Sequence, residues 1–582
     1  MAALCSRLSK FAAEALRRSQ RSVTNRAVRV VTPFVVVALV AVGMPAASFA
    51  EATVSLARPS GPGLFTDLRA ATTDGPITSL DYQNCGGAPP TPAPPTPAPP
   101  HPGNPYQPVM ISRRGAWVAS PAITFKPCPY KLDWTMPDRL TEEAAKYPRT
   151  DYLYPQAGWR ANVFIISEQG TAVTTACGTD TVWRWTITAR PANSAKAKLV
   201  DAMGCKVTLT TPTLGTFTVR GSLSKASDPK HVELTSATGK ILVKDLLIAA
   251  VGDSNGSGEG NGPFFDYQCN RSFKSYQFRT AQAIEKADRR TSVTLVWTSC
   301  SGARIEHLTT RKYPGVHPAF GPALPPQVAQ VSDALTFPVR PYAPRAGRTP
   351  RKVDVVLTSV GVNDLSFGSV LEFCIKGSLK SSPGLRQMVP SLQCENRRVK
   401  ETKDINGDTS FSGSSSSKDP TLDAVVRGRI DGLKRGYLSY QRSLASELAV
   451  PPSQVILTEY PDFATNDHQE LCGTRAGDYL IHPFPALAKN EWAWLQRMGD
   501  LLNGAVARSG FTHVTGLSRQ FLGRGYCAVG SLIVPLPKAL FFVQTEGAFH
   551  PNEQGHGISE SANLPFACRA LFGNANCRSK QP

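Results

Sequence analysis

The stretch Leu246–Gly260, with the sequence LLIAAVGDSNGSGEG, decides the fold of the C-terminal half of this chain. It opens with an unbroken apolar run, which is typical of a strand buried on both faces of a parallel sheet. The glycine-rich turn that follows places Ser254 at the carboxyl end of that strand, where open α/β sheets bind their ligands. A serine there can attack with its hydroxyl while its own backbone N–H faces the same point. The turn could also be a flexible linker or a phosphate-binding loop, although no G-x-x-x-x-G-K-S/T pattern follows it.

Other apolar runs of the same kind follow along the chain, and amphipathic helical patterns separate them. The runs are Val293–Trp297, Val353–Leu357 and Val455–Thr458, and the helical patterns begin near Leu422 and near Trp494. This alternation predicts a doubly wound parallel α/β domain over residues 241–582. We expect Arg311–Pro350 and Lys400–Asp419 to be surface insertions, the second with the polar composition of a disordered segment.

The first 109 residues do not have the composition of a folded domain. Residues 1–50 combine a basic stretch, an apolar run from Val30 to Met44 and small residues at Ser48 and Ala50, which predicts an export signal cleaved near Ala50. A retained anchor is the alternative, but the apolar run is short for crossing a bilayer. Residues 51–109 form an N-terminal segment that ends in a proline-rich linker. We therefore expect a secreted protein, extracellular or periplasmic.

Residues 110–240 contain short β-rich runs separated by turn residues, which predicts a small β-sandwich-like domain. Trp183 and Trp185 could form a platform for a sugar, but we expect them to pack in the core. The chain has a net charge of +20, which could favour acidic polymers. Because no arginine and aromatic stripe accompanies this charge, we interpret it as a solvated basic surface and expect no nucleic-acid partner.

The cysteines indicate disulfides rather than a metal site. There are 13, of which Cys5 lies in the leader, and none forms a C-x-x-C pair. No H-E-x-x-H motif or Ca²⁺ loop appears either, so we expect no metal and no cofactor. Pairing in chain order is the simplest connectivity, and the sequence alone leaves others open. It would join Cys85–Cys128, Cys177–Cys205, Cys269–Cys300, Cys374–Cys394, Cys472–Cys527 and Cys568–Cys577.

Four short segments carry a resemblance to a known family. They are Gly252-Asp253-Ser254, Cys300-Ser301-Gly302-Ala303, Gly361-Val362-Asn363-Asp364 and Phe549-His550-Pro551-Asn552. In this order they resemble the sequence blocks of the SGNH hydrolases, a branch of the GDSL-type esterases and lipases. Cys269-Asn270-Arg271-Ser272 is similar to a segment of secreted actinobacterial members. The resemblance covers about residues 241–570 and implies the disulfides Cys269–Cys300, Cys374–Cys394 and Cys472–Cys527.

The resemblance implies a flavodoxin-like SGNH fold and a secreted serine ester hydrolase, an esterase or lipase, that needs no cofactor. Ser254 would be the catalytic nucleophile and His550 its base, while Gly302 and Asn363 would donate hydrogen bonds in the oxyanion hole. The substrate would be an acyl ester, either a lipid or an acylated small molecule or polysaccharide.

One position departs from the family pattern, which usually has an aspartate three residues before the histidine. Here Gly547 occupies that position, and Glu546 lies one residue earlier. Glu546 or a backbone carbonyl could orient His550. We favour the backbone carbonyl, so that Ser254 and His550 would act as a pair without an acidic third member. We interpret Asp253 and Asp364 as loop caps and Asp462 as a turn residue. The remaining histidines of this domain are expected on the surface or in the core, namely His307, His317, His468, His482, His513 and His556.

Two alternatives remain open at this point. The same site could remove acetyl groups from a polysaccharide, with the β-rich domain contacting the polymer. The chain could also be a non-catalytic secreted binding or adhesion protein, for which Gly547 in place of the aspartate is the only residue-level indication.

Overall fold

The structure is a computed structural model that describes residues 111–113, 116–118 and 130–577. Within the last range it leaves out residues 141–157, 168–179, 193, 229–232, 337–350, 380–392, 404–408, 476–477, 479–486 and 537–546. The export signal, the proline-rich linker, Glu546, Cys85, Cys128, Cys177 and His482 therefore lie outside the described residues. Among the described residues, no helix combines the length and the apolar composition needed to cross a bilayer.

Five strands that pair in parallel form the centre of the C-terminal half. They are β9 (Glu233–Gly252), β10 (Thr291–Trp297), β11 (Val355–Ser359), β14 (Val455–Thr458) and β15 (Thr512–Val514). Their spatial order is β10-β9-β11-β14-β15, so the chain order reads 2-1-3-4-5, which is the order of flavodoxin-like doubly wound folds. Every residue of β10, β11 and β14 is buried, which explains their apolar runs. The prediction of an α/β domain with a largely parallel sheet is confirmed.

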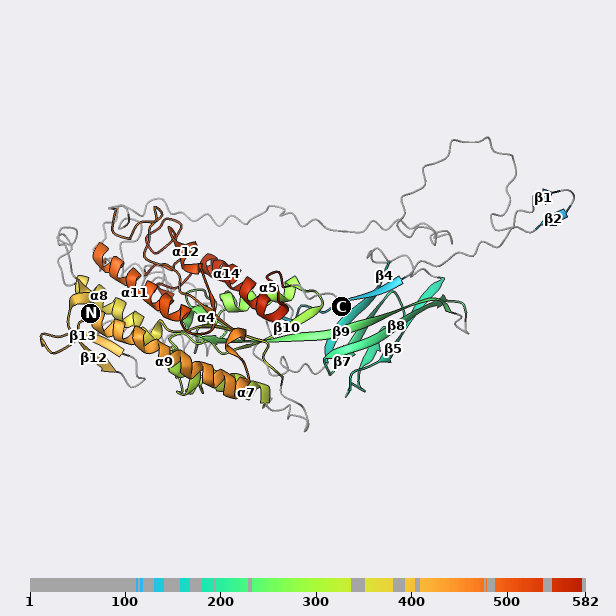
Figure 1. Cartoon of the computed structure of the whole chain (residues 1–582), viewed down its shortest axis with the longest axis horizontal. Helices are drawn as coiled ribbons and strands as arrows, with labels where there is room; N and C mark the ends of the chain where they lie inside the picture. The colour runs from blue at the N-terminus through green and yellow to red at the C-terminus, as the bar shows by residue number, and fades with distance from the viewer. Residues whose placement is uncertain are drawn as a thin grey trace, which may run out of the picture. The chain divides into compact units, whose positions relative to one another are not determined.

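Helices cover this sheet from both sides (Figure 1). On one side α5 (Tyr276–Ala287) packs against α14 (Glu553–Phe572), and α14 also contacts β11, β14 and β15. On the other side α9 (Leu422–Leu448) packs against α7 (Gln327–Thr336) and α11 (Lys489–Ala507). The buried residues of α9 recur at helical spacing, and they include Val426, Ile430, Leu433, Tyr437, Tyr440 and Leu444.

Short elements connect these helices and strands. They are α4 (Ser254–Ser257), α6 (Ile305–Thr309), α8 (Phe367–Leu379), α12 (Leu517–Phe521) and the single-turn helices η6 (Pro318–Phe320), η7 (Asn363–Leu365), η8 (Cys394–Asn396) and η9 (Pro452–Gln454). Two more strands, β12 (Val399–Lys403) and β13 (Thr409–Gly413), pair antiparallel. The expectation of a disordered Lys400–Asp419 is therefore wrong for these strands. The Arg429 guanidinium lies 5.3 Å from the ring centre of Phe411 in β13, and this contact ties the hairpin to α9.

The β-rich region before residue 240 contains two antiparallel sets of strands around one hydrophobic core. One sheet has the order β3 (Tyr130–Thr135), β4 (Trp159–Ser167), β7 (Lys206–Thr211) and β6 (Lys198–Val200). In the other set, β5 (Thr181–Ala189) pairs with β8 (Gly215–Lys225), which pairs with the first part of β9. Trp183 and Trp185 are buried between them, so their expected core role is confirmed. Farther toward the N-terminus, β1 (Ile111–Arg113) pairs with β2 (Ala116–Val118).

Strand β9 belongs to both halves of the described chain. It pairs with β8 as far as Val243 and with β10 from Lys244 onward. The domain boundary predicted after residue 240 therefore falls inside one continuous strand rather than in a linker.

Four disulfides lie within the described residues, and their pairs are those of the chain-order pairing. They are Cys269–Cys300, Cys374–Cys394, Cys472–Cys527 and Cys568–Cys577. Cys205 is also disulfide-bonded. Glu491 lies close to the sulfurs of Cys374 and Cys394, but a disulfide leaves these sulfurs no thiolate with which to bind a metal ion.

Candidate active site

The turns that leave β9, β10 and β11 meet at the carboxyl edge of the parallel sheet. In the strand register Gly252 lies beside Ser359, and Trp297 lies beside Ala250. Beyond these pairs, the Asp253 N–H donates to the Ser359 carbonyl at 2.9 Å. A Cβ on Gly252 would lie 2.3 Å from the same carbonyl, so this close approach requires glycine. Between β9 and β11 the strand order reverses, and ligands bind at such a point in doubly wound folds.

Ser254 is the first residue of the short helix α4 and is buried, with 4% of its surface exposed. Asp253 caps this helix by accepting a hydrogen bond from the Asn255 N–H at 3.1 Å. Because Ser254 begins the helix, its own N–H has no acceptor within it. The Ser254 hydroxyl forms no hydrogen bond with any described residue. Both the N–H and the hydroxyl are therefore available to a ligand.

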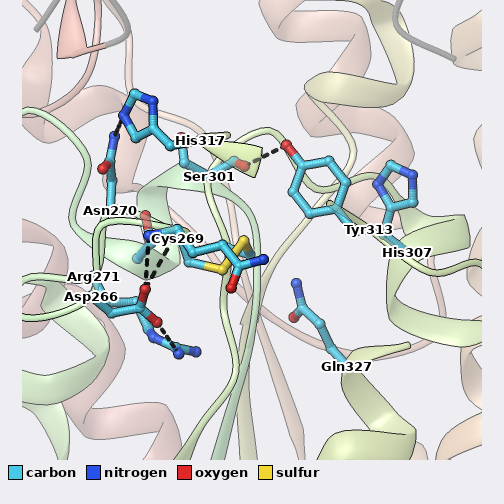
Figure 2. The surroundings of a disulfide bond; sticks show 12 residues. Asp266, Cys269, Asn270, Arg271, Ser301, His307, Tyr313, His317 and Gln327 are labelled. Carbon is cyan, nitrogen blue, oxygen red and sulfur yellow. Dashed lines mark hydrogen bonds and ion pairs between the residues drawn. A yellow bond between two sulfur atoms is a disulfide. The ribbon is translucent and has the colours of Figure 1, made fainter. Parts of the chain in front are cut away.

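Gly302 lies in the turn after β10, and its φ of +81° is in the left-handed region. A Cβ there would lie 2.3 Å from Tyr313 Oη, so only glycine fits. Tyr313 donates its hydroxyl proton to the Ser301 carbonyl at 2.7 Å, and the Cys269–Cys300 disulfide holds the other side of this turn (Figure 2). Sequence reasoning missed Tyr313, because no motif marks a tyrosine that supports a neighbouring turn.

Asn363 begins η7 in the turn after β11 and reaches the turn after β10. Its Nδ2 donates to the Ala303 carbonyl at 3.1 Å. An amide nitrogen carries two protons, so the second remains for another acceptor. The adjacent Asp364 accepts the Ile305 N–H at 3.2 Å, which caps α6, and burial raises the pKa of Asp364 to about 7. The loop-cap role expected for Asp364 is consistent with this contact.

The loop that carries His550 rests against the turn that carries Ser254. A Cβ placed on Gly260 would lie 3.0 Å from the Gly547 carbonyl oxygen and 3.5 Å from His550 Cβ. Main-chain bonds to Val534 fix the loop, since the Val534 N–H donates to the His550 carbonyl at 2.8 Å. The imidazole Nδ1 lies 3.1 Å from the Ala548 carbonyl oxygen, a hydrogen bond if Nδ1 carries the proton. A backbone carbonyl thus contacts the ring nitrogen, as expected for one of the two ways of orienting His550.

Asp253 is fully buried and surrounded by neutral donors. Tyr460 Oη donates to Asp253 Oδ2 at 2.5 Å, and Ser359 Oγ donates to Oδ1 at 2.7 Å. Burial raises the pKa of Asp253 to about 6, although these hydrogen bonds oppose the change. Asp462, in contrast, accepts the Ala464 N–H at 2.8 Å, as expected for a turn residue.

Two further histidines near these turns are in the core. His307 stacks on Tyr313 with ring centres 4.4 Å apart, and burial lowers its pKa to about 4. His556 Nδ1 accepts the Tyr276 N–H at 3.2 Å, and burial lowers the pKa of His556 to about 3. A histidine held neutral in this way is a poor candidate for a base that must gain a proton near neutral pH.

No family model matches this chain, and no curated protein matches it. Among solved structures, it is similar to a GDSL-like lipase from Parabacteroides merdae, with 13% identity and a TM-score of 0.26 over 56% of this chain and 97% of that one. It is also similar to an acetylxylan esterase from Geobacillus stearothermophilus, with 11% identity and a TM-score of 0.25 over 56% of this chain and 95% of that one. A third similar structure is a family two carbohydrate esterase from Clostridium thermocellum, with 12% identity and a TM-score of 0.19 over 74% of this chain and 95% of that one. Similarities this low assign neither a family nor a residue's role.

Proposed function

We propose that the chain is a secreted serine ester hydrolase with the SGNH fold, in which Ser254 and His550 form the catalytic pair. The observation that carries the proposal is the convergence of four turns. Those of Ser254, Gly302 and Asn363 leave neighbouring parallel strands at one edge, and the His550 loop rests on the first of them. Their order along the chain matches the sequence blocks of the SGNH hydrolases.

In the proposed reaction Ser254 Oγ attacks the carbonyl carbon of an ester, and His550 Nε2 takes the hydroxyl proton. The oxyanion that forms would accept hydrogen bonds from the Ser254 N–H, the Gly302 N–H and Asn363 Nδ2. The existing bond from Asn363 to the Ala303 carbonyl would hold the amide in place, so that little reorganisation is needed when charge develops. His550 then returns the proton to the departing alcohol, and an ester to Ser254 remains.

Water completes the cycle through the same groups. His550 removes a proton from the water as its oxygen attacks the acyl carbon, and Ser254 Oγ leaves and recovers that proton. The protonated imidazole must be stabilised twice in each cycle. The Ala548 carbonyl, 3.1 Å from Nδ1, supplies a dipole for this purpose and favours the tautomer in which Nε2 can accept the proton. Neither a metal nor a cofactor takes part in these steps.

The rest of the proposal concerns the surroundings of the enzyme. Four disulfides among the described residues suit an oxidising compartment, which agrees with the export signal expected at residues 1–50. The substrate class is an acyl ester of a lipid, small molecule or polysaccharide, with polymer contact through the β-rich region as an additional proposal.

The test is hydrolysis of p-nitrophenyl esters from acetyl to long acyl chains by the wild-type protein and by Ser254→Ala. We expect turnover that falls by about 10⁴-fold or more in the variant, together with loss of fluorophosphonate labelling. Ser446→Ala, at an exposed position of α9, is the matched serine control and should keep wild-type turnover.

Acyl preference distinguishes the substrate classes, because a polysaccharide deacetylase would favour acetyl over long chains. Wild-type protein that shows no Ser254-dependent turnover and no labelling would overturn the proposal and favour a non-catalytic binding protein.

A further inference from the structure

Tyr460 lies two residues beyond β14, yet its side chain reaches across β11 to the end of β9. The ring is buried, with 7% of the residue exposed, and its hydroxyl contacts two different turns. It donates to Asp253 Oδ2 at 2.5 Å, and it accepts the Val362 N–H at 3.2 Å. One hydroxyl therefore joins the residue before Ser254 to the residue before Asn363.

The anchoring of Tyr460 itself is also specific. Asn503 on α11 accepts the Tyr460 N–H at 2.8 Å and donates to the Tyr460 carbonyl at 2.9 Å. The backbone of Tyr460 is thus fixed from one side while its hydroxyl holds two turns on the other. A phenol in this position uses both its donor and its acceptor, so replacing it would remove a partner from the buried Asp253 carboxylate and from the half-buried Val362 N–H.

We propose that Tyr460 is a positioning residue that sets the distance between the Ser254 nucleophile and the Asn363 oxyanion donor. This inference rests on the proposed function. Asp253 caps α4, and α4 begins with Ser254, so a shift of the carboxylate moves the nucleophile. Val362 precedes Asn363 directly, so a shift of its N–H moves the amide donor. Tyr460 does not touch the reacting atoms, and it acts through these two turns.

The test is Tyr460→Phe, which keeps the ring and removes only the bridging hydroxyl. We expect kcat for p-nitrophenyl esters to fall by about 10- to 100-fold, because small misplacements at a reacting centre have effects of that size. KM should stay within about twofold, since no substrate contact is removed. The matched control is Ser359→Ala, which removes the other hydroxyl donor to Asp253 but leaves the Val362 contact in place. Its loss of kcat should be clearly smaller.

A double-mutant cycle with Asn363→Ala separates positioning from general destabilisation. If Tyr460 acts by placing Asn363, Tyr460→Phe should have a much smaller effect in the Asn363→Ala background than in the wild type. Additive losses in the cycle, or a Tyr460→Phe variant with wild-type kcat, would overturn the inference. If Tyr460→Phe does not fold, Asp253→Asn tests the other end of the bridge with the same cycle. Loss of Ser254-dependent turnover in the wild-type protein would instead overturn the proposed function.

Discussion

At the two edges of the parallel sheet, the surroundings of a buried aspartate shift its pKa in opposite directions. At the amino edge Asp245 contacts two guanidinium groups, with Arg139 at 3.1 Å and Arg351 at 2.5 Å. Burial alone would raise the pKa of Asp245, but the two cations, together with hydrogen bonds from Ser292 and Thr294, outweigh it and the pKa is lowered. At the carboxyl edge Asp253 is bonded only to neutral hydroxyl and amide donors, and burial raises its pKa to about 6.

This difference separates the part of the sheet that is built for stability from the part proposed for catalysis. An aspartate with a lowered pKa stabilises the fold above its unfolded pKa, and that stability is lost as pH falls through the folded pKa. An aspartate with a raised pKa has the opposite effect on stability. As pH rises from its unfolded pKa toward its folded pKa, it lowers the free energy of unfolding. The amino edge also joins the β-rich region, since Arg351 lies 5.7 Å from the ring centre of Trp159 in β4.

The largest effect on stability is expected from breaking the amino edge. Asp245→Ala would leave Arg139 and Arg351 as buried cations without their carboxylate, so the free energy of unfolding should fall by about 3–5 kcal/mol. Denaturant unfolding monitored by fluorescence measures this, with Asp431→Ala on the exposed face of α9 as the control. A change of less than about 1 kcal/mol would mean that the charge pairs do not stabilise this edge.

The next effect concerns catalysis at the carboxyl edge. Asn363→Ala should lower kcat by about 10²- to 10³-fold, which corresponds to one oxyanion donor, and should change the unfolding midpoint little. Asn363→Asp has the same shape but no donor at the oxyanion, so it should be about as inactive in the same steady-state assay. An active Asn363→Asp variant would contradict the donor role that we propose for Asn363.

The pH dependence of stability sharpens the contrast further. Asp364 has a pKa of about 7 in the folded chain against about 4 for an aspartate in an unfolded chain. Wild-type stability should therefore decline as pH rises from 5 to 8, and Asp364→Asn should remove this contribution. Relative to the wild type, the variant should gain about 1–3 kcal/mol between these pH values in urea titrations. A variant that loses stability relative to the wild type over this pH range would contradict the predicted direction of the pH dependence.

The smallest effect is expected from a charge pair that water already solvates. Arg220 and Glu233 lie 2.7 Å apart on the β-rich region, with 43% and 39% of their side chains exposed. Glu233→Gln should change the free energy of unfolding by about 0–1 kcal/mol, and high salt should reduce the difference. An effect as large as that of Asp245→Ala would show that burial does not decide the value of these pairs.

The strands of the parallel sheet could be predicted from sequence because burial on both faces leaves an unbroken apolar signature. The run Val455–Thr458 coincides with β14 for this reason. Strand β15 was missed, because three residues that include His513 give no such signature. The hairpin of β12 and β13 was also missed, since most of its residues are exposed and polar, as in a disordered segment. In these two strands only Val399 and Thr409 are buried, and Phe411 is partly buried.

For the candidate site, the sequence identified the residues with short motifs but not the residues that hold them. Ser254, Gly302, Asn363 and His550 each lie in a recognisable block, and their roles stay predictions. Tyr313 and Tyr460 support two of these turns through side chains that come from other parts of the chain. Contacts of this kind leave no local pattern, so only the fold reveals them. The same is true of Asp245 and its partners Arg139 and Arg351.

The continuity of strand β9 has a consequence for how the protein unfolds. Because one uninterrupted strand is a member of both halves, neither can melt without removing a pairing partner from the other. A calorimetric scan should therefore show the halves losing structure in one cooperative transition. A fragment that stops at residue 240 would take only the first part of β9 with it. A graft of the β-rich half onto another protein would need to carry β9 at least as far as Val243, the last of its residues that pairs with β8.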